Sequence, residues 1–255
     1  MPASLEATPL PPQARLEQYY HSEQERRRVV REMFHDAAEG YDHAETLTSF
    51  GSGRRYRRQA LKRAGLSPGM RALDVATGTG LVAREAIKIL GGVENLVGVD
   101  ATRGMLALAS KNLGIVAIEA LAEDIPLTDG QFDFLSMGYA LRHVSNLGQT
   151  FREYRRVLKP GGRVCILEIT RPRTGLARLF LKFYIRGVVP LLSRLTRKGR
   201  KAGILWKYYW ETIEACVDPE TIMQAMRNAG FVDVKRHVEL GIFSEYTGVR
   251  PNDEA

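Results

Sequence analysis

From residue 70 onward, short apolar runs alternate with longer stretches in which apolar residues recur at helical spacing. A chain that alternates strands and helices in this way encodes a parallel sheet with crossover helices. We predict strands over residues 71–76, 96–100, 115–119, 132–137, 163–169, 231–238 and 242–249. We predict helices over residues 81–90, 104–112, 150–158 and 219–228. The pattern therefore indicates an α/β fold, with helices on both faces of a seven-stranded sheet.

Two helices are predicted before this region. Residues 23–38 place Val30 and Phe34 on one apolar helical face, and a basic helix follows over residues 54–64. We expect Arg26, Arg27 and Arg28 to lie mostly in water, and a polar linker from Gly40 to Gly51 to join the two helices. The predicted parts are a flexible tail (1–22), a helical cap (23–69), an α/β core (70–170), a basic aromatic insertion (171–215) and the end of the core (216–255).

An apolar strand starting near Ala72 leads into a glycine-rich loop, Gly78-Thr79-Gly80, which opens a helix. Such a loop brings backbone N–H groups and a positive helix end to one point, where a nucleotide-like ligand can bind. In many proteins the same small residues only allow the chain to turn. Asp100 favours binding, because it ends the second strand of a Rossmann-like sheet, where its carboxylate can accept hydrogen bonds from both ribose hydroxyls.

Two cofactor classes use this geometry. A dinucleotide places a pyrophosphate on the helix N-terminus, which would make the chain a dehydrogenase. S-adenosylmethionine carries a sulfonium cation and an amino group, which favour a nearby carboxylate. Asp74, four residues before Gly78, is suited to face that amino group directly or through water. The sequence therefore favours S-adenosylmethionine.

The loops after the third and fourth strands supply further candidates. Ala122 and Glu123 would lie beside an adenine ring, although they could equally form a solvated acidic turn. Tyr139 follows the fourth strand, where side chains face the crevice above the sheet. Arg142 can orient an oxyanion, and His143 can act as a base near neutral pH, although a histidine here could also be a core or capping residue.

Composition and charge narrow the class of protein. The 255 residues carry a net charge of +8, and residues 170–210 contain eleven Lys or Arg and no Asp or Glu. The insertion within this stretch fits either a cap helix with a solvated charged face or a helix on an anionic membrane surface. Cys165 and Cys216 are expected to be buried and unpaired, which together with the absence of a signal sequence indicates the cytoplasm, with possible attachment to the inner face of the membrane. No convincing group of metal ligands is present, and the oligomeric state is left open.

Taken together, the motifs identify a resemblance to the ubiquinone/menaquinone biosynthesis C-methyltransferase family (the UbiE type), a class I S-adenosylmethionine-dependent methyltransferase family. The resemblance covers about residues 29 to 250. It is carried by VREMFHDAAEGYD, TSFG, LDVATGTG, VGVD, AEDIPLTDGQFD, ALRHV, RVLKPGG, LEITRP and AGFVDV. The YD and SFG pairs around the linker are its most specific part.

The resemblance implies carbon methylation of a quinone or quinone precursor. It implies that Tyr41 closes over the cofactor and that Arg142 lies near the ring carbon that accepts the methyl group. With the residue-based candidates, the predicted cofactor-binding residues are Tyr41, Asp74, Ala76, Thr77, Gly78, Thr79, Gly80, Asp100, Ala101, Met105, Ala122 and Glu123. The predicted catalytic residues are Arg142 and His143, and the predicted substrate-binding residues are Tyr139, Tyr184, Tyr208 and Tyr246.

Several positions depart from the family pattern. His143 stands where the family usually has Asn, Tyr246 replaces a His, and residues 206–210 are more aromatic than usual. Methylation of oxygen or of another aromatic metabolite therefore stays open, as does which of Arg142, His143 or a water accepts the proton. A nucleic-acid methyltransferase is disfavoured, because residues 136–139 lack the Asn/Asp-Pro-Pro-aromatic motif. A non-catalytic lipid-binding subunit is disfavoured by the intact glycine loop.

Overall fold

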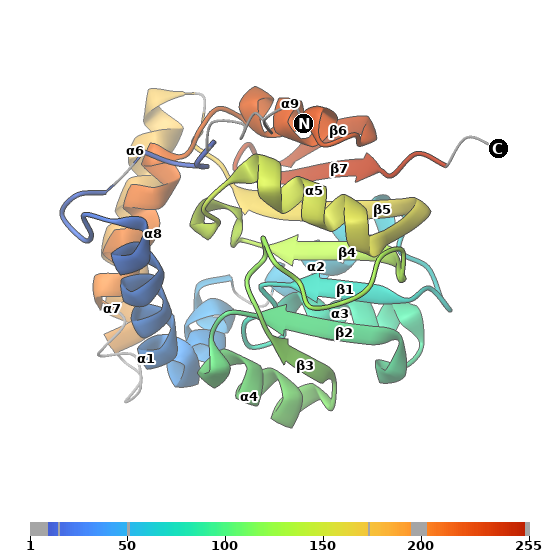
Figure 1. Cartoon of the computed structure of the whole chain (residues 1–255). Coiled ribbons are helices and arrows are strands. Elements are labelled where there is room, and N and C mark those ends of the chain that lie inside the picture. Colours follow the sequence, from blue (N-terminus) through green and yellow to red (C-terminus); the bar gives the residue numbers. More distant parts are fainter. Residues whose placement is uncertain (1–9, 15, 50–51, 173, 195–202, 253–255) are drawn as a thin grey trace.

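The computed structural model describes residues 10–14, 16–49, 52–172, 174–194 and 203–252. Seven strands form one sheet in the order β3-β2-β1-β4-β5-β7-β6 (Figure 1). All neighbouring strands are parallel except β7, which is antiparallel to both β5 and β6. The strands are β1 (Ala72–Val75), β2 (Leu96–Asp100), β3 (Val116–Glu119), β4 (Phe132–Gly138), β5 (Leu158–Ile169), β6 (Val232–Glu239) and β7 (Phe243–Val249). The predicted α/β fold class is confirmed.

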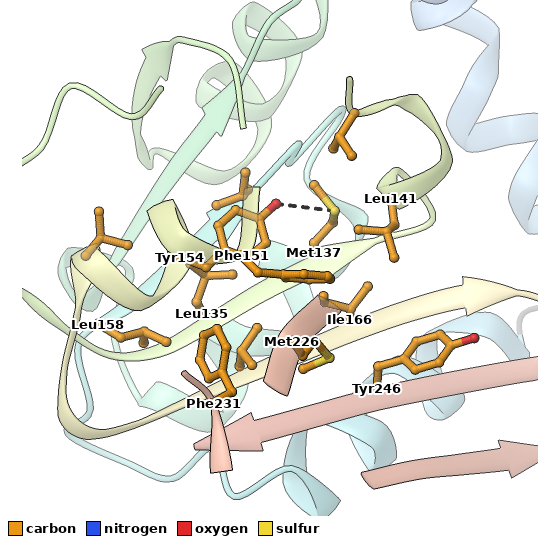
Figure 2. Close-up of a cluster of buried hydrophobic side chains, with 14 of the residues drawn as sticks. Leu135, Met137, Leu141, Phe151, Tyr154, Leu158, Ile166, Met226, Phe231 and Tyr246 are labelled. Carbon is orange, nitrogen blue, oxygen red and sulfur yellow. Dashed lines mark hydrogen bonds between the residues drawn. The ribbon is translucent and has the colours of Figure 1, made fainter. Parts of the chain in front are cut away.

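Helices cover both faces of the sheet. On one face, α5 (Leu147–Val157) and α9 (Pro219–Asn228) bury Phe151 and Met226 against β4, β5 and β7 (Figure 2). On the other face, α2 (Ser52–Arg63), α3 (Leu81–Leu90) and α4 (Arg103–Leu113) pack through a second cluster that includes Leu61 and Ala109. Two short 3-10 helices, η1 (Val93–Asn95) and η2 (Leu141–His143), follow α3 and β4. These two apolar layers hold the carboxyl ends of β1 to β4 in fixed positions.

The helix α1 (Glu23–Ser49) is longer than predicted. We expected a helix over residues 23–38 and a linker from Gly40, but the backbone stays helical through Ser49. An interior glycine costs a helix only about 1 kcal/mol, and packing can offset that cost. Since α1 packs against α4 and two helices of the insertion, contacts distant in sequence extend it.

The insertion after β5 is helical where the structure describes it. It contains α6 (Gly175–Phe183), the π-turn η3 (Tyr184–Val188), α7 (Val189–Arg194) and α8 (Gly203–Ala215). Together with α1 these helices form a layer at the carboxyl-end side of the sheet, on the left in Figure 1. Inside the layer, Ile185 and Val189 pack against Trp206 and Tyr209. No helix of the described residues is long and apolar enough to cross a membrane.

Residues 10–14 and 16–22 are packed, although we expected a flexible tail up to residue 22. The Ala14 amide donates to the carbonyl of Ala215 at 3.3 Å, and the Val217 amide donates to the carbonyl of Pro12 at 2.9 Å. Tyr20 is 1 % exposed. The prediction was wrong for these residues because their partners lie about 200 residues further along the chain and cannot be inferred from local composition. The first nine residues of the predicted tail lie outside the described residues.

Candidate functional site

A cavity of about 180 Å³ lies at the carboxyl ends of β1 to β4, beneath α1. Strand ends meet at this edge because the strands are parallel, and ligands bind in such crevices. The predicted site residues that line it are Ala76, Thr77, Gly78, Thr79, Asp100, Ala101, Met105, Ala122, Glu123, Tyr139 and His143. The structure thus brings together most of the residues that the sequence indicated for the cofactor.

Backbone groups hold the Asp100 carboxylate in a fixed orientation. The Gly78 amide donates to one oxygen at 2.8 Å, and the Thr102 amide donates to the other at 2.8 Å. Gly78 has φ +56°, a left-handed conformation that glycine adopts without strain. Burial raises the pKa of Asp100. Each oxygen keeps a further acceptor position, so this cradle can take the two hydroxyls of a ribose.

Asp74 lies under the glycine loop and is not among the described lining residues. It accepts hydrogen bonds from Thr77 Oγ1 at 2.7 Å and from Ser136 Oγ at 2.6 Å. Complete burial raises its pKa to about 6, which the two hydroxyl donors oppose. One oxygen is bonded to Thr77 of the loop and the other to Ser136 of β4, so Asp74 ties the loop to the sheet rather than lining the cavity.

Gly80 also supports the loop from outside the cavity lining. It has φ +88°, and a Cβ added there would lie 2.4 Å from Leu113 Cδ1. Only glycine therefore allows α4 to pack this closely against the start of α3. The position is needed for packing, in addition to any contact with a ligand.

Two non-glycine residues of the cavity lining have left-handed backbones. Ala76 has φ +53° directly after β1, and Tyr139 has φ +60° directly after β4. Such conformations are strained for residues with a Cβ and cluster at sites where a side chain or amide must be aimed. The Tyr139 amide donates to the carbonyl of Leu167 at 2.7 Å, which helps hold the conformation. Both positions mark this edge of the sheet as a ligand site.

His143 is a neutral imidazole in the cavity wall. Burial, together with the positive charges of Arg142 and Arg26, lowers its pKa well below the usual value of 6.5. Its ring stacks on Tyr208 at 5.7 Å between centroids, and Nδ1 lies 3.5 Å from the Tyr208 hydroxyl. Its Nε2 is buried and has no hydrogen-bond partner among the described residues. Buried polar atoms are ordinarily hydrogen-bonded, so this nitrogen calls for a partner that a ligand or an ordered water can supply.

Arg142 is directed away from this cavity. Its Nη1 donates to Glu168, and its Nε donates to Thr212 Oγ1 at 3.2 Å. The guanidinium carbon lies 4.6 Å from the centre of the Tyr209 ring. Burial alone would lower the pKa of Arg142, but the charge of Glu168 outweighs it and raises the pKa. Arg142 is completely buried and does not line either of the two cavities described here.

A second cavity, of about 680 Å³, adjoins the first beneath the insertion. Arg57 and Tyr139 line both cavities and therefore lie between them. The wall of the second cavity is strongly aromatic, with Tyr56, Tyr139, Tyr184, Trp206, Tyr209 and Phe243. Such a space suits a planar, apolar ligand whose reactive end reaches the first cavity.

The predicted substrate tyrosines do not all reach this space. Tyr184 lines the second cavity. Tyr208 stacks on the ring of His143 and lines neither the first nor the second cavity. Tyr246 of β7 lies in the hydrophobic core beside Ile166 and is completely buried (Figure 2). The side chain of Tyr41, and most of the TSFG segment, lie outside what the structure describes.

Arginines of α1 form part of the site, which was not expected from the sequence. Arg26, Arg27 and Arg31 line the first cavity together with Val30 and Phe34. Arg26 is 7 % exposed, contrary to the expectation that it lies in water. Its Nη1 donates to the carbonyl of His143 at 2.8 Å and its Nη2 to Glu23 at 2.6 Å. The apolar face of α1 was visible in the sequence, but the burial of Arg26 depends on partners in residues 143–145.

One group of side chains could be considered for a metal ion. His237, Glu239 and Glu245 place one ligand atom each within 4.8 Å of one another. Arg63 donates to Glu245 at 2.5 Å and to Glu239 at 3.2 Å, so the two carboxylates already have a cationic partner. The group therefore fits an ion-pair network on β6 and β7.

The sequence matches the ubiE/COQ5 methyltransferase family over residues 20–250. The chain belongs to this family. It is 37 % identical over 227 residues to the ubiquinone/menaquinone biosynthesis C-methyltransferase UbiE of Geobacter sulfurreducens, covering 86 % of this chain and 87 % of that one. It is 30 % identical over 237 residues to the protein of the same name from Pseudomonas aeruginosa, covering 90 % and 91 %. The predicted methyltransferase activity is confirmed.

Solved structures confirm the methyltransferase fold. A possible histamine N-methyltransferase from Thermotoga maritima aligns with a TM-score of 0.59 and 22 % identity, covering 86 % of this chain and 99 % of that one. A Haemonchus contortus phosphoethanolamine N-methyltransferase 2, solved with S-adenosyl-L-methionine, aligns with a TM-score of 0.56 and 17 % identity, covering 78 % and 53 %. At these identities the likeness concerns the fold.

S-adenosylmethionine is the cofactor of this methyltransferase, as predicted. The first cavity fits it on three features of the structure. The Asp100 cradle suits the ribose, the small residues at 76–79 leave room beside the loop, and the α1 arginines offer a cationic partner for a carboxylate. Ala122 and Glu123 line the side of the cavity where the loop after β3 runs.

Proposed function

We propose that this methyltransferase adds a methyl group to a ring carbon of a quinone-type aromatic substrate, bound in the second cavity. The observation that carries the proposal is the adjoining pair of cavities, with Arg57 and Tyr139 shared between them. The names of the two bacterial relatives, which describe ubiquinone and menaquinone biosynthesis, support this class of acceptor. When bound, S-adenosylmethionine supplies an electrophilic methyl group.

In this proposal the first cavity binds the cofactor. Asp100 would accept hydrogen bonds from the ribose hydroxyls, Thr77 to Thr79 would contact the amino-acid part, and Ala122 and Glu123 would lie beside the adenine; all of them line this cavity. An arginine from α1 or α2 pairs with the carboxylate of the amino-acid part. Rigid positioning of both reactants supplies much of the rate enhancement.

His143 is proposed as the group that accepts the proton. A phenol or hydroquinone attacks through carbon only when its hydroxyl is deprotonated or strongly hydrogen-bonded, because that charge must reach the ring carbon. His143 lines the first cavity, its pKa is lowered, and its buried Nε2 has no hydrogen-bond partner among the described residues, which makes it the candidate for this task. The ring hydrogen replaced by the methyl group then leaves as a proton to a water, and the imidazolium returns its proton to the ring oxygen, so that one proton is released for each methyl group transferred.

Arg142 is proposed to act through its surroundings. Its position behind His143, paired with Glu168, does not allow direct contact with a ligand in either cavity. Its positive charge contributes to lowering the pKa of His143, which keeps the imidazole unprotonated and able to accept a proton, although it also makes the imidazole a weaker base. Arg142 also fixes Tyr209, whose ring lines the acceptor cavity.

The proposal is tested by identifying the methylated product. The protein is incubated with isotopically labelled S-adenosylmethionine and, separately, with a short-chain demethylated quinol, its long-chain analogue and a simple phenol. We expect the label on a ring carbon of the quinols, located by fragment masses. Label on oxygen, or transfer only to the phenol, would show that the acceptor class is different.

A further inference from the structure

The outer face of α6 and α7 carries large apolar side chains that are exposed. Leu176 is 81 % exposed, Phe180 is 72 % exposed and Phe183 is 66 % exposed, and Leu179 and Leu191 are also exposed. In α6 they fall at positions i, i+3, i+4 and i+7, so they share one helical face. Isolated apolar residues are ordinary on protein surfaces, but a contiguous apolar face marks an interaction site.

A basic stripe runs beside this apolar face. Arg178, Lys182 and Arg186 recur every four residues, and Lys182 and Arg186 are exposed. Residues 170–210 contain no acidic residue at all. An apolar helical face bordered by Lys and Arg is typical of helices that lie in the interface of an anionic membrane. Two copies of this chain would bring two basic stripes together, which charge repulsion disfavours.

The opposite face of the same segment forms part of the acceptor cavity. Tyr184, Ile185 and Val189 line that cavity, and Ile185 and Val189 pack on α8. The helical segment from Gly175 to Arg194 is therefore a wall with the exposed apolar face on one side and the aromatic cavity on the other.

We propose that the exposed face of α6 and α7 docks on an anionic membrane surface, so that the acceptor enters the second cavity from the bilayer. The entry of the acceptor rests on the proposed function, whereas the docking itself does not. Phe180 and Phe183 enter the acyl boundary, and Lys182 and Arg186 contact the phosphates. This is docking on one leaflet, consistent with the lack of a membrane-crossing helix among the described residues.

The test is co-sedimentation of the full chain with vesicles of phosphatidylcholine alone and with added phosphatidylglycerol. The variant is Phe180→Ser/Phe183→Ser, and the matched control is Val116→Ser/Val232→Ser, which changes two exposed apolar residues on the edge strands β3 and β6. Circular dichroism and S-adenosylmethionine binding verify that every variant is folded. The molecular mass in solution is measured by light scattering for each protein.

We expect binding to the anionic vesicles that weakens with salt, a loss of at least tenfold in the Phe180→Ser/Phe183→Ser variant, and wild-type binding in the control. Methylation of a short-chain quinol should be unchanged in the variant, while methylation of a long-chain quinol in vesicles falls. Absence of vesicle binding, equal binding by the variant, or a dimer that the variant dissociates would overturn the proposal. If neither quinol is methylated but vesicle binding follows the prediction, only the proposed function fails.

Discussion

Arg142 and Glu168 form an ion pair in which both side chains are completely buried. The pair joins η2 to the end of β5, and Arg142 adds a hydrogen bond to Thr212 and a contact with the Tyr209 ring of α8. Three elements next to the two cavities, η2, β5 and α8, are thus held by one guanidinium. The pair is part of how α8 is fixed over the sheet.

Glu168→Gln should therefore strongly destabilise the protein. Removing one partner leaves a buried charge uncompensated, which costs about 3–5 kcal/mol. Chemical denaturation measures the loss. The control is Glu220→Gln, which breaks an exposed pair with Arg227 and should cost less than about 1 kcal/mol. Equal effects of the two substitutions would contradict the role given to the buried pair.

Because the pKa of His143 is lowered, we expect the free energy of unfolding to depend on pH. Its pKa is lowered in the folded protein, so the unfolded chain binds a proton below about pH 6.5 that the folded one does not. Stability should consequently fall as the pH drops through this value. Unfolding free energies of the wild type and His143→Asn, compared between about pH 7 and 5, should diverge with the wild type losing more. A constant difference would mean that His143 is not held neutral.

The rate of methyl transfer should also depend on the protonation state of His143. Because a base must be unprotonated, the lowered pKa of His143 should place the acid limb of kcat well below pH 6.5. His143→Asn should reduce kcat. Its affinity for S-adenosylmethionine should stay within about threefold of the wild-type value, because the substitution removes at most one hydrogen bond of an uncharged group. Equal kcat values in both proteins would transfer the proton-accepting role to another group.

Because the pKa of Asp74 is raised, we expect this residue to make the free energy of unfolding depend on pH with the opposite sign. Its folded pKa is raised from 3.8 to about 6, so the folded protein holds the proton more tightly than the unfolded one. Stability from this group is present below about pH 4 and is lost as the pH rises to about 6. Asp74→Asn should remove the dependence, and the wild type should lose on the order of 3 kcal/mol relative to it across this window. A difference that does not vary with pH would contradict the assignment.

Much of the core could be predicted from the sequence, because local patterns determine it. The helix over residues 81–90, the strand over residues 96–100 and the helix over residues 219–228 have the predicted bounds. Asp100 and Gly78 could be paired because a strand end and a glycine loop have fixed places in a parallel sheet. Those parts of the cofactor site follow from the fold.

Other parts depend on contacts that the sequence does not display. Arg142 is directed by Glu168 and Thr212, which lie 26 and 70 residues further along the chain, so its burial could not be inferred from its position after β4. The extension of α1 and the packing of residues 10–14 have the same cause. The cap and the insertion were thus less predictable than the sheet.

Asp100→Asn should weaken the binding of S-adenosylmethionine at least tenfold, as measured by titration calorimetry. The carboxylate would lose the charge-assisted hydrogen bonds to the ribose, each of which contributes about 1.5–3 kcal/mol. The control is Asp129→Asn, an exposed residue paired with Arg156 outside both cavities. Unchanged affinity in Asp100→Asn would overturn the assignment of the cradle.

In the proposed function the two adjoining cavities have separate roles, one holding the cofactor and the other the aromatic acceptor. Tyr184 lines only the second of them. The most direct measurement is the KM for a short-chain quinol, beside the Kd for S-adenosylmethionine, in Tyr184→Leu. We predict that the KM rises several-fold while the Kd is unchanged. A Kd that rises with the KM, or a KM equal to that of the wild type, would contradict the division.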